Sequence, residues 1–266
     1  MLDKLKFHAS AAAPLFSGTD GLTDTQIKRI AELQFEKDNG VNANGNKVKW
    51  TDNKDAELKD LLKRKANFDD GIVELPKGAK TYVENVVNQI VYGYRPAFAQ
   101  KGNRQVEKGQ QVEDDAIELI GTYFMKEYKK SDSSLKKGHF VGHPDIEDEE
   151  DEMILDNKSS WTKETFPTLP EHIDSSMYEW QGKLYCYMKG WRSFRLVYTL
   201  MTTPEGLIPE NENDDLHYAD DLNIGLRVTY VDYELTDEDI AHIERRHNAA
   251  VEYALKYYSK LMEKVK

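Results

Sequence analysis

Residues 142–160 read GHPDIEDEEDEMILDNKSS, and this stretch decides the fold that the sequence predicts. Apolar positions in and around it indicate two strands, His139–Ile146 and Met153–Ser159. Between them lie the consecutive acidic residues 147–152, which are typical of a solvated turn. The sequence therefore predicts two neighbouring strands that bring the residues at their ends together.

Three polar side chains of this strand pair are suited to act together. Asp156 and Lys158 lie two residues apart on the second strand, so both side chains face the same side of a sheet. Pro144 fixes a bend directly before Asp145, which aims that carboxylate out of the first strand. Because the two strands are adjacent, we expect Asp145 and Asp156 to converge on one point.

The elements around this pair predict a mixed α/β fold. Helical spacing indicates helices at Thr23–Glu36, Asp55–Lys65, Lys80–Tyr92, Val112–Tyr128, Leu169–Trp191 and Thr236–Lys264, with further strands at Phe194–Thr202 and Leu226–Glu234. Strands enclosed by helices indicate a central mixed sheet that helices flank. We expect residues 1–100 to form a mostly helical region packed on a core that spans 101–266 and ends in the long C-terminal helix.

The composition indicates a soluble globular protein in a reducing compartment. Of the 266 residues, 39% are hydrophobic and 32% are charged, which suits a folded chain. A single cysteine, Cys186, excludes an internal disulfide, a cysteine-based zinc site and an iron–sulfur cluster. The first ten residues lack the apolar stretch of a signal peptide, and no stretch is long enough for a membrane span. We therefore expect a cytoplasmic protein that does not bind membranes.

The net charge of −12 is the main objection to nucleic-acid binding, because phosphate contacts need lysine and arginine. Net charge is a sum over the whole chain, however, whereas a binding groove is local. Grouped carboxylates also bind divalent cations that neutralise them. Asp145 and Asp156 supply the hard oxygen ligands that Mg²⁺ or Mn²⁺ prefers, and Lys158 can orient a water or neutralise an oxyanion. These groups suit metal-dependent hydrolysis of a phosphodiester.

Two more motifs complete an ordered set. Gly109 followed by Glu113 opens a predicted helix, and Gln181 and Tyr185 share one face of a later helix. Together with Gly-His-Pro-Asp at 142–145 and Asp-Asn-Lys at 156–158, they resemble the PD-(D/E)XK nuclease superfamily, whose core is the restriction-endonuclease-like α/β fold. Within it the set is similar to the branch of lambda-type, YqaJ-type and RecB-type exonucleases. The motifs cover about residues 105–205.

The resemblance implies a role for each matching residue. The implied metal ligands are Glu113, Asp145 and Asp156, to which Asn157 can add its backbone carbonyl. Lys158 corresponds to the catalytic lysine, and Gln181 acts beside it. The residues expected to contact DNA are Ser159, Ser160, Trp161, Gln181, Tyr185 and Arg104, the last at a terminal phosphate.

These features predict a Mg²⁺- or Mn²⁺-dependent DNA exonuclease, a hydrolase that degrades duplex DNA from its ends in phage-type recombination or repair. The resemblance further implies a ring-shaped homo-oligomer and a single-strand annealing protein as partner, in the host cytoplasm if a phage encodes the chain. Two alternatives stay open. One is a structure- or site-specific DNA endonuclease on the same fold, and the other is a nuclease-like protein that binds nucleic acid without cutting it.

Several residues also have a plainer interpretation. Glu113 opens a run of three acids that suits the first turn of any helix, so Asp115 is an alternative ligand. His139 and His143 suggest zinc, but no third histidine or cysteine lies nearby. Trp161 suits a base contact or a core position. The cations predicted to form a phosphate track are Lys163, Lys183, Lys189, Arg192 and Arg195.

Overall fold

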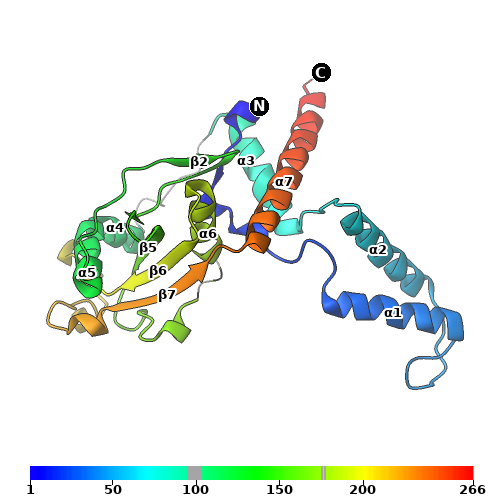
Figure 1. Ribbon diagram of the computed structural model, residues 1–266, viewed down its shortest axis with the longest axis horizontal. Coiled ribbons are helices and arrows are strands. Elements are labelled where there is room, and N and C mark those ends of the chain that lie inside the picture. Colours follow the sequence, from blue (N-terminus) through cyan, green and yellow to red (C-terminus); the bar gives the residue numbers. More distant parts are fainter. Residues whose placement is uncertain (95–102, 175, 177, 266) are drawn as a thin grey trace. The chain divides into compact units, whose positions relative to one another are not determined.

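The computed structural model describes residues 1–94, 103–174, 176 and 178–265 (Figure 1). The α-helices of these residues are α1 (Asp24–Asn39), α2 (Asp52–Asp69), α3 (Lys77–Tyr92), α4 (Arg104–Gln111), α5 (Glu113–Phe124), α6 (Tyr178–Lys189) and α7 (Asp237–Glu263). The strands are β1 (Phe7–His8), β2 (Leu135–Lys137), β3 (Phe140–Gly142), β4 (Ile146–Asp148), β5 (Met153–Ser159), β6 (Ser193–Thr199) and β7 (Val228–Glu234). Short 3-10 turns lie at Leu2–Lys4, Ala9–Ala11, Ala13–Phe16, Pro170–His172, Glu205–Leu207, Asp214–Leu216 and Ile224–Leu226.

The strands form two mixed sheets, which confirms the predicted mixed α/β fold. The larger sheet has the order β4-β5-β6-β7, in which β5 and β6 are parallel and the outer pairs are antiparallel. The smaller sheet has the order β1-β3-β2, with β1 parallel and β2 antiparallel to β3. Among the described residues, no helix is long and apolar enough to cross a membrane.

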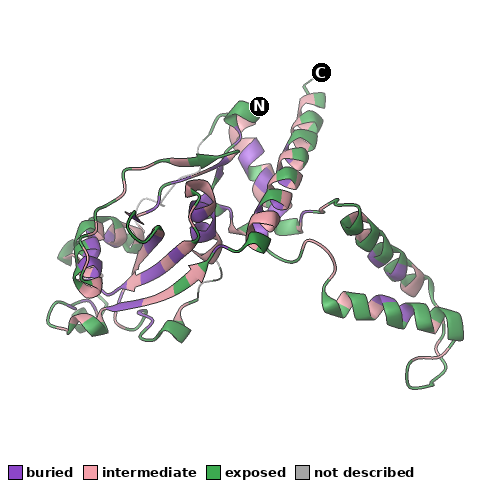
Figure 2. Ribbon diagram, viewed as in Figure 1, coloured by how far each residue is buried: buried purple, intermediate pink, exposed green. Residues whose placement is uncertain are grey.

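Helices cover the two faces of the larger sheet. Successive side chains of β5 point to opposite faces, so they contact α5 and α6 in turn. Leu155 packs with Ile117 and Ile120 of α5 in an apolar cluster. Figure 2 shows buried positions in purple on α5 and on the strands of this sheet. The next side chain, Asp156, faces the other way and contacts α6. Gly182 lets α6 approach β6 closely, because a Cβ there would lie 2.2 Å from the ring of Phe194. Asp156, and with it Lys158 two residues later, therefore lies on the face of the sheet that α6 covers.

The chain forms two compact units, each discontinuous in sequence, whereas the expected ranges 1–100 and 101–266 are continuous. One unit comprises residues 1–13 and 86–240 and contains both sheets. The other comprises residues 14–85 and 241–266 and is helical. In the helical unit, α1 and α2 pack through Ile30, Leu33, Leu58 and Leu61. Thr23 caps α1, and Gln26 returns a hydrogen bond to the Thr23 backbone.

Three predicted elements are wrong in their bounds. The strand expected at His139–Ile146 is two strands, β3 and β4, in different sheets, because Pro144 has no N–H to continue a ladder. The helix expected to reach Tyr128 ends at Phe124, where Met125 is left-handed with φ 55°. The helix expected from Leu169 begins at Tyr178.

Candidate active site

Strand β5 presents Asp156 and Lys158 side by side. The Asp156 side chain is 2% exposed and forms an ion pair with Lys158, which is 24% exposed. Burial acts to lower the pKa of Lys158, but the charges of Asp156 and Asp145 outweigh it, so this pKa lies above its ordinary value. The lysine therefore stays protonated and supplies a positive charge at the end of β5.

Asp145 reaches the same place from the connection between β3 and β4. Its Oδ2 accepts a hydrogen bond of 2.7 Å from the backbone N–H of Asn157. Burial, and after it the charge of Asp156, raises the pKa of Asp145 to about 7. The predicted convergence of the two aspartates is thus present, and their mutual repulsion makes the pair a suitable place for a cation.

Gln181 and Tyr185 contribute from α6, one turn apart. The Gln181 Nε2 donates to Asp156 Oδ1 and to the Tyr185 hydroxyl, both at 3.0 Å. Burial and the charge of Asp156 raise the pKa of Tyr185 above its ordinary value, so this hydroxyl stays protonated. Both side chains are buried, and their contacts fix the orientation of the Asp156 carboxylate.

Glu113, the first residue of α5, lines the same pocket but has another partner. Its Oε2 lies 2.6 Å from the Nζ of Lys130. The pocket has a volume of about 480 Å³. It is lined by Gln105, Val106, Gly109 and Gln110 of α4 together with Glu113, Asp145, Asn157, Lys158, Ser159, Tyr178 and Tyr198.

The residues present suit a Mg²⁺-like ion. Asp156 Oδ2 is buried, and its charge partner among the described residues is the ammonium of Lys158. Within the same residues, no three His, Cys, Asp or Glu side chains already form a metal-binding group. Two carboxylates are enough for Mg²⁺, which retains several of its waters. Asp145 and Asp156 therefore fit the ion, and Glu113 would add a third ligand on leaving Lys130.

Of the other predicted site residues, Asn157 and Ser159 lie beside the pocket and bond to the neighbouring strand. The Asn157 side chain accepts from Thr199 Oγ1 at 2.9 Å, and Ser159 Oγ lies 3.2 Å from the same hydroxyl. Arg104 is exposed at the start of α4. The Asn157 side chain thus points toward β6, which leaves its backbone as the predicted contact.

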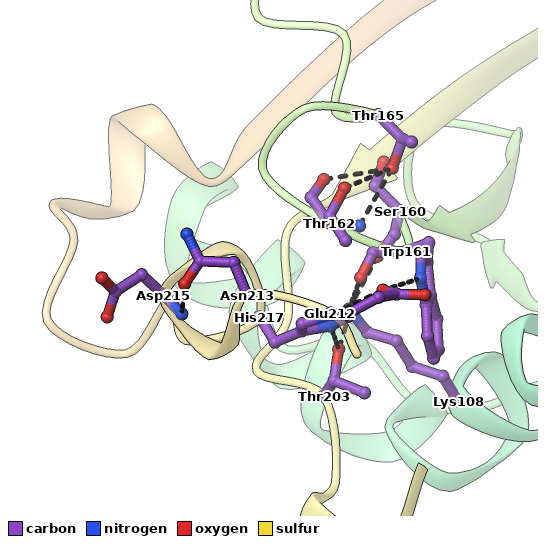
Figure 3. Close-up of polar contacts among 10 residues, drawn as sticks. All are labelled: Lys108, Ser160, Trp161, Thr162, Thr165, Thr203, Glu212, Asn213, Asp215 and His217. Atoms are coloured by element: carbon purple, nitrogen blue, oxygen red, sulfur yellow. Dashed lines mark hydrogen bonds and ion pairs between the residues drawn. The ribbon is translucent and has the colours of Figure 1, made fainter. Parts of the chain in front are cut away.

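Ser160 and Trp161 are held in an internal network (Figure 3). Trp161 Nε1 donates to Glu212 at 3.1 Å, and the ring meets His217 edge-on at 5.1 Å. Glu212 also lies 2.9 Å from His217 Nε2. Ser160 is buried. The Trp161 ring is therefore engaged within the protein, which favours its structural interpretation over base stacking.

Lys108 is a residue beside the site that sequence reasoning missed. It is fully buried, and its Nζ donates to the carbonyls of Ser160 at 2.7 Å and Trp161 at 2.9 Å (Figure 3). It thereby joins α4 to the end of β5, two walls of the pocket. The only sequence signal is its place before Gly109 in the first motif, since lysine is rarely buried.

The cations of the predicted phosphate track mostly form ion pairs with acids of the same unit, and the track stays a prediction. Lys183 pairs with Asp239, Lys189 with Glu147 and Glu149, Arg192 with Asp237, and Arg195 with Asp232. Lys163 donates to the backbone carbonyl of Asp215. Sequence spacing placed these cations near the site but carried no information on their distant acidic partners.

Comparisons with known proteins find similarity in structure. No protein-family model matches the chain, and no curated protein matches its sequence. A phage-related exonuclease from Haemophilus somnus 129PT is similar in structure, with a TM-score of 0.65 and 25% identity over 76% of this chain and 89% of that one. The alkaline exonuclease of Laribacter hongkongensis has a TM-score of 0.52 and 15% identity over 73% of this chain and 89% of that one.

The same enzyme in complex with dAMP gives a TM-score of 0.54 at 14% identity and covers 99% of this chain and 95% of that one. At these identities the Laribacter structures show the fold alone. The chain therefore shares the fold of phage-related and alkaline exonucleases, which confirms the resemblance drawn from the sequence and is consistent with the exonuclease branch of the PD-(D/E)XK superfamily.

Proposed function

We propose that this protein is a metal-dependent exonuclease that hydrolyses phosphodiester bonds at the ends of duplex DNA. The observation that carries the proposal is that Asp145 and Lys158 line one pocket of an exonuclease fold, with the buried Asp156 paired to Lys158 beside it. The 25% identity to the phage-related exonuclease supports the activity, and its phage origin supports a role in recombination or repair.

The residues divide the chemistry among them. Asp145 and Asp156 would hold Mg²⁺ or Mn²⁺, and such an ion supplies charge neutralisation and a more acidic bound water. The Lys158 ammonium is placed to stabilise the negative charge that develops on the phosphate. Gln181 keeps the Asp156 carboxylate in position through its 3.0 Å hydrogen bond. Glu113 completes the ligand set once it is free of Lys130.

The test compares linear and circular DNA. End-labelled linear duplex and closed circular duplex are incubated with the protein in Mg²⁺, in Mn²⁺ and in EDTA. Lys158→Ala is the variant expected to be inactive, and Lys129→Ala is its matched control because that lysine is 83% exposed and its acidic partner among the described residues is Glu127 at 3.5 Å. We expect metal-dependent loss of the linear substrate with wild type and Lys129→Ala, and none with Lys158→Ala.

Each other result selects an alternative. Cleavage of the circle would favour the endonuclease that the same centre allows. DNA binding without cleavage in any metal would favour a nuclease-like binding protein. The annealing partner and the ring-shaped oligomer rest on the resemblance alone, and they become testable by co-purification and by mass measurement in solution.

A further inference from the structure

Most described lysines and arginines of residues 86–240 form ion pairs with acids, and Lys136 of β2 is one of those that do not. The smaller sheet is different in its sequence. No Asp or Glu occurs between residues 4 and 19, which include β1, or between residues 133 and 144, which include β2 and β3. These segments contain Lys4, Lys6, Lys136 and Lys137 with three histidines.

The strand register places several of these side chains on one face. His8 lies opposite Val141, and Val141 lies opposite Lys136, so the three form one row across the sheet. Residues that pair across a sheet share a face, and so do alternate residues along one strand. Lys6, two residues before His8, and His143, two residues after Val141, therefore lie on this face as well. We call Lys6, His8, Lys136 and His143 the basic face, and all four residues are exposed.

The opposite face of the sheet is buried against α6. The next row consists of Phe7, Phe140 and Lys137, and both phenylalanines are buried. Lys137 Nζ lies 3.8 Å from the centre of the Tyr187 ring on α6. Gly142 also faces α6, since a Cβ there would lie 2.5 Å from the Tyr185 ring. The basic face is therefore the solvent side of a sheet that packs on the helix of Gln181 and Tyr185.

Two lysines of the basic face have no acidic partner among the described residues. Lys6 and Lys136 form no ion pair with any acid among the described residues. Burial, and after it the charges of Lys6 and His143, lowers the pKa of His8. An anion on this face would relieve that repulsion, as phosphate groups do along DNA.

The basic face also adjoins the candidate site along the chain. His143 is separated from Asp145 by Pro144 alone. We propose that the basic face binds the phosphate backbone of the duplex that flanks the reacting phosphodiester. The proposal rests on the proposed function, because it assigns a surface to that substrate.

The test is the salt dependence of DNA binding. Binding of a fluorescent duplex is followed by anisotropy in EDTA, so that no cleavage occurs, over a range of NaCl concentrations. The variant is Lys6→Gln/Lys136→Gln. Its matched control is Lys129→Gln/Arg192→Gln, which removes two cations of the same unit that already pair with Glu127 and Asp237. Thermal unfolding checks that both variants are folded.

Each phosphate contact contributes about 0.9 to the slope of log K against log salt. We expect the Lys6→Gln/Lys136→Gln variant to lose about 2 from that slope and to bind roughly threefold to tenfold more weakly at low salt. The control should match wild type. An unchanged slope in a folded variant, or no DNA binding by wild type, would overturn the proposal.

A failure of the basic face and a failure of the proposed function can be told apart. A normal slope change in a protein that cleaves no DNA with Mg²⁺ or Mn²⁺ would support the face and contradict the activity. Metal-dependent cleavage together with an unchanged slope would support the activity and contradict the basic face. The charge-reversed variant K6E/K136E extends the same comparison and should bind more weakly than the glutamine variant.

Discussion

The ammonium of Lys130 lies 2.6 Å from Oε2 of Glu113, the predicted metal ligand at the start of α5. The backbone fixes this arrangement, because Lys130 pairs with Ile146 and the Ser131 N–H donates to the Asp145 carbonyl at 2.8 Å. The hydrogen bond to Glu113 is the largest influence on Lys130 and raises its pKa. A lysine thus holds a carboxylate that the proposed metal would need.

Lys130→Met should therefore tighten metal binding, since the competing cation is removed. An ion pair this exposed contributes about 0.2–1 kcal/mol, which corresponds to an increase in Mn²⁺ affinity of up to about fivefold. Isothermal titration with Mn²⁺ measures it, with Lys129→Met as control. Weaker binding would mean instead that Lys130 positions Glu113 for the metal.

Gln181→Leu should lower kcat on duplex ends while the protein stays folded. A hydrogen bond to a charged group contributes about 1.5–3 kcal/mol, so a loss of roughly 10- to 100-fold is expected when Asp156 loses its donor. Tyr185→Phe keeps the bond between Gln181 and Asp156 and should cost much less. Equal losses in the two variants, measured by initial rates at saturating DNA, would show that the tyrosine hydroxyl matters as much as the amide.

Lys108→Met should change how stability depends on pH. Burial lowers the pKa of Lys108 to about 8 from 10.5, so between these values the unfolded chain binds more protons than the folded one. The contribution of Lys108 to the free energy of unfolding therefore becomes more favourable as the pH rises from about 8 to 10.5. From pH 7.5 to pH 9.5, wild type should gain about 1–2 kcal/mol in free energy of unfolding relative to the variant. Urea unfolding at both values tests this, and a constant difference would refute it.

Asp20→Asn should destabilise the helical unit of residues 14–85 and 241–266. Asp20 accepts from Arg246 Nε at 2.6 Å, and from His242 Nδ1 and Arg245 Nε at 2.8 Å, and Arg246 is fully buried. Removing one member of a buried ion pair costs about 3–5 kcal/mol. Chemical unfolding followed by helical circular dichroism measures the loss, and Asp24→Asn is an exposed control.

The Asp20 carboxylate also predicts that the folded protein loses stability in acid. Burial acts to raise the pKa of Asp20, but the hydrogen bonds from His242 and Arg245 outweigh it and lower this pKa to about 2. A lowered pKa stabilises the fold above the ordinary value of 3.8, and that contribution is lost as the pH falls toward 2. Asp20→Asn should remove this part of the acid sensitivity.

The sequence by itself determined the features that depend on near neighbours. Alternation along β5 put Asp156 and Lys158 on one side, because successive side chains of a strand point to opposite faces. Gln181 and Tyr185 meet because residues four apart stack on a helix. Thr23 began α1 as a helix cap should. Each of these relations joins residues that are close in the sequence, so it follows from the local secondary structure alone.

Tertiary structure alone decided which charges are neutralised and which are free. The partners of Lys189 and Arg195 are Glu147 and Asp232, which lie 42 and 37 residues away. Glu113 meets Lys130 only because the segment after α5 returns to pair beside Asp145. Coulomb energies depend on distance in space and on burial, and neither is written in the order of residues. For that reason the convergence of Asp145 and Asp156 could be predicted from the sequence, whereas the acidic partners of the surrounding cations could not.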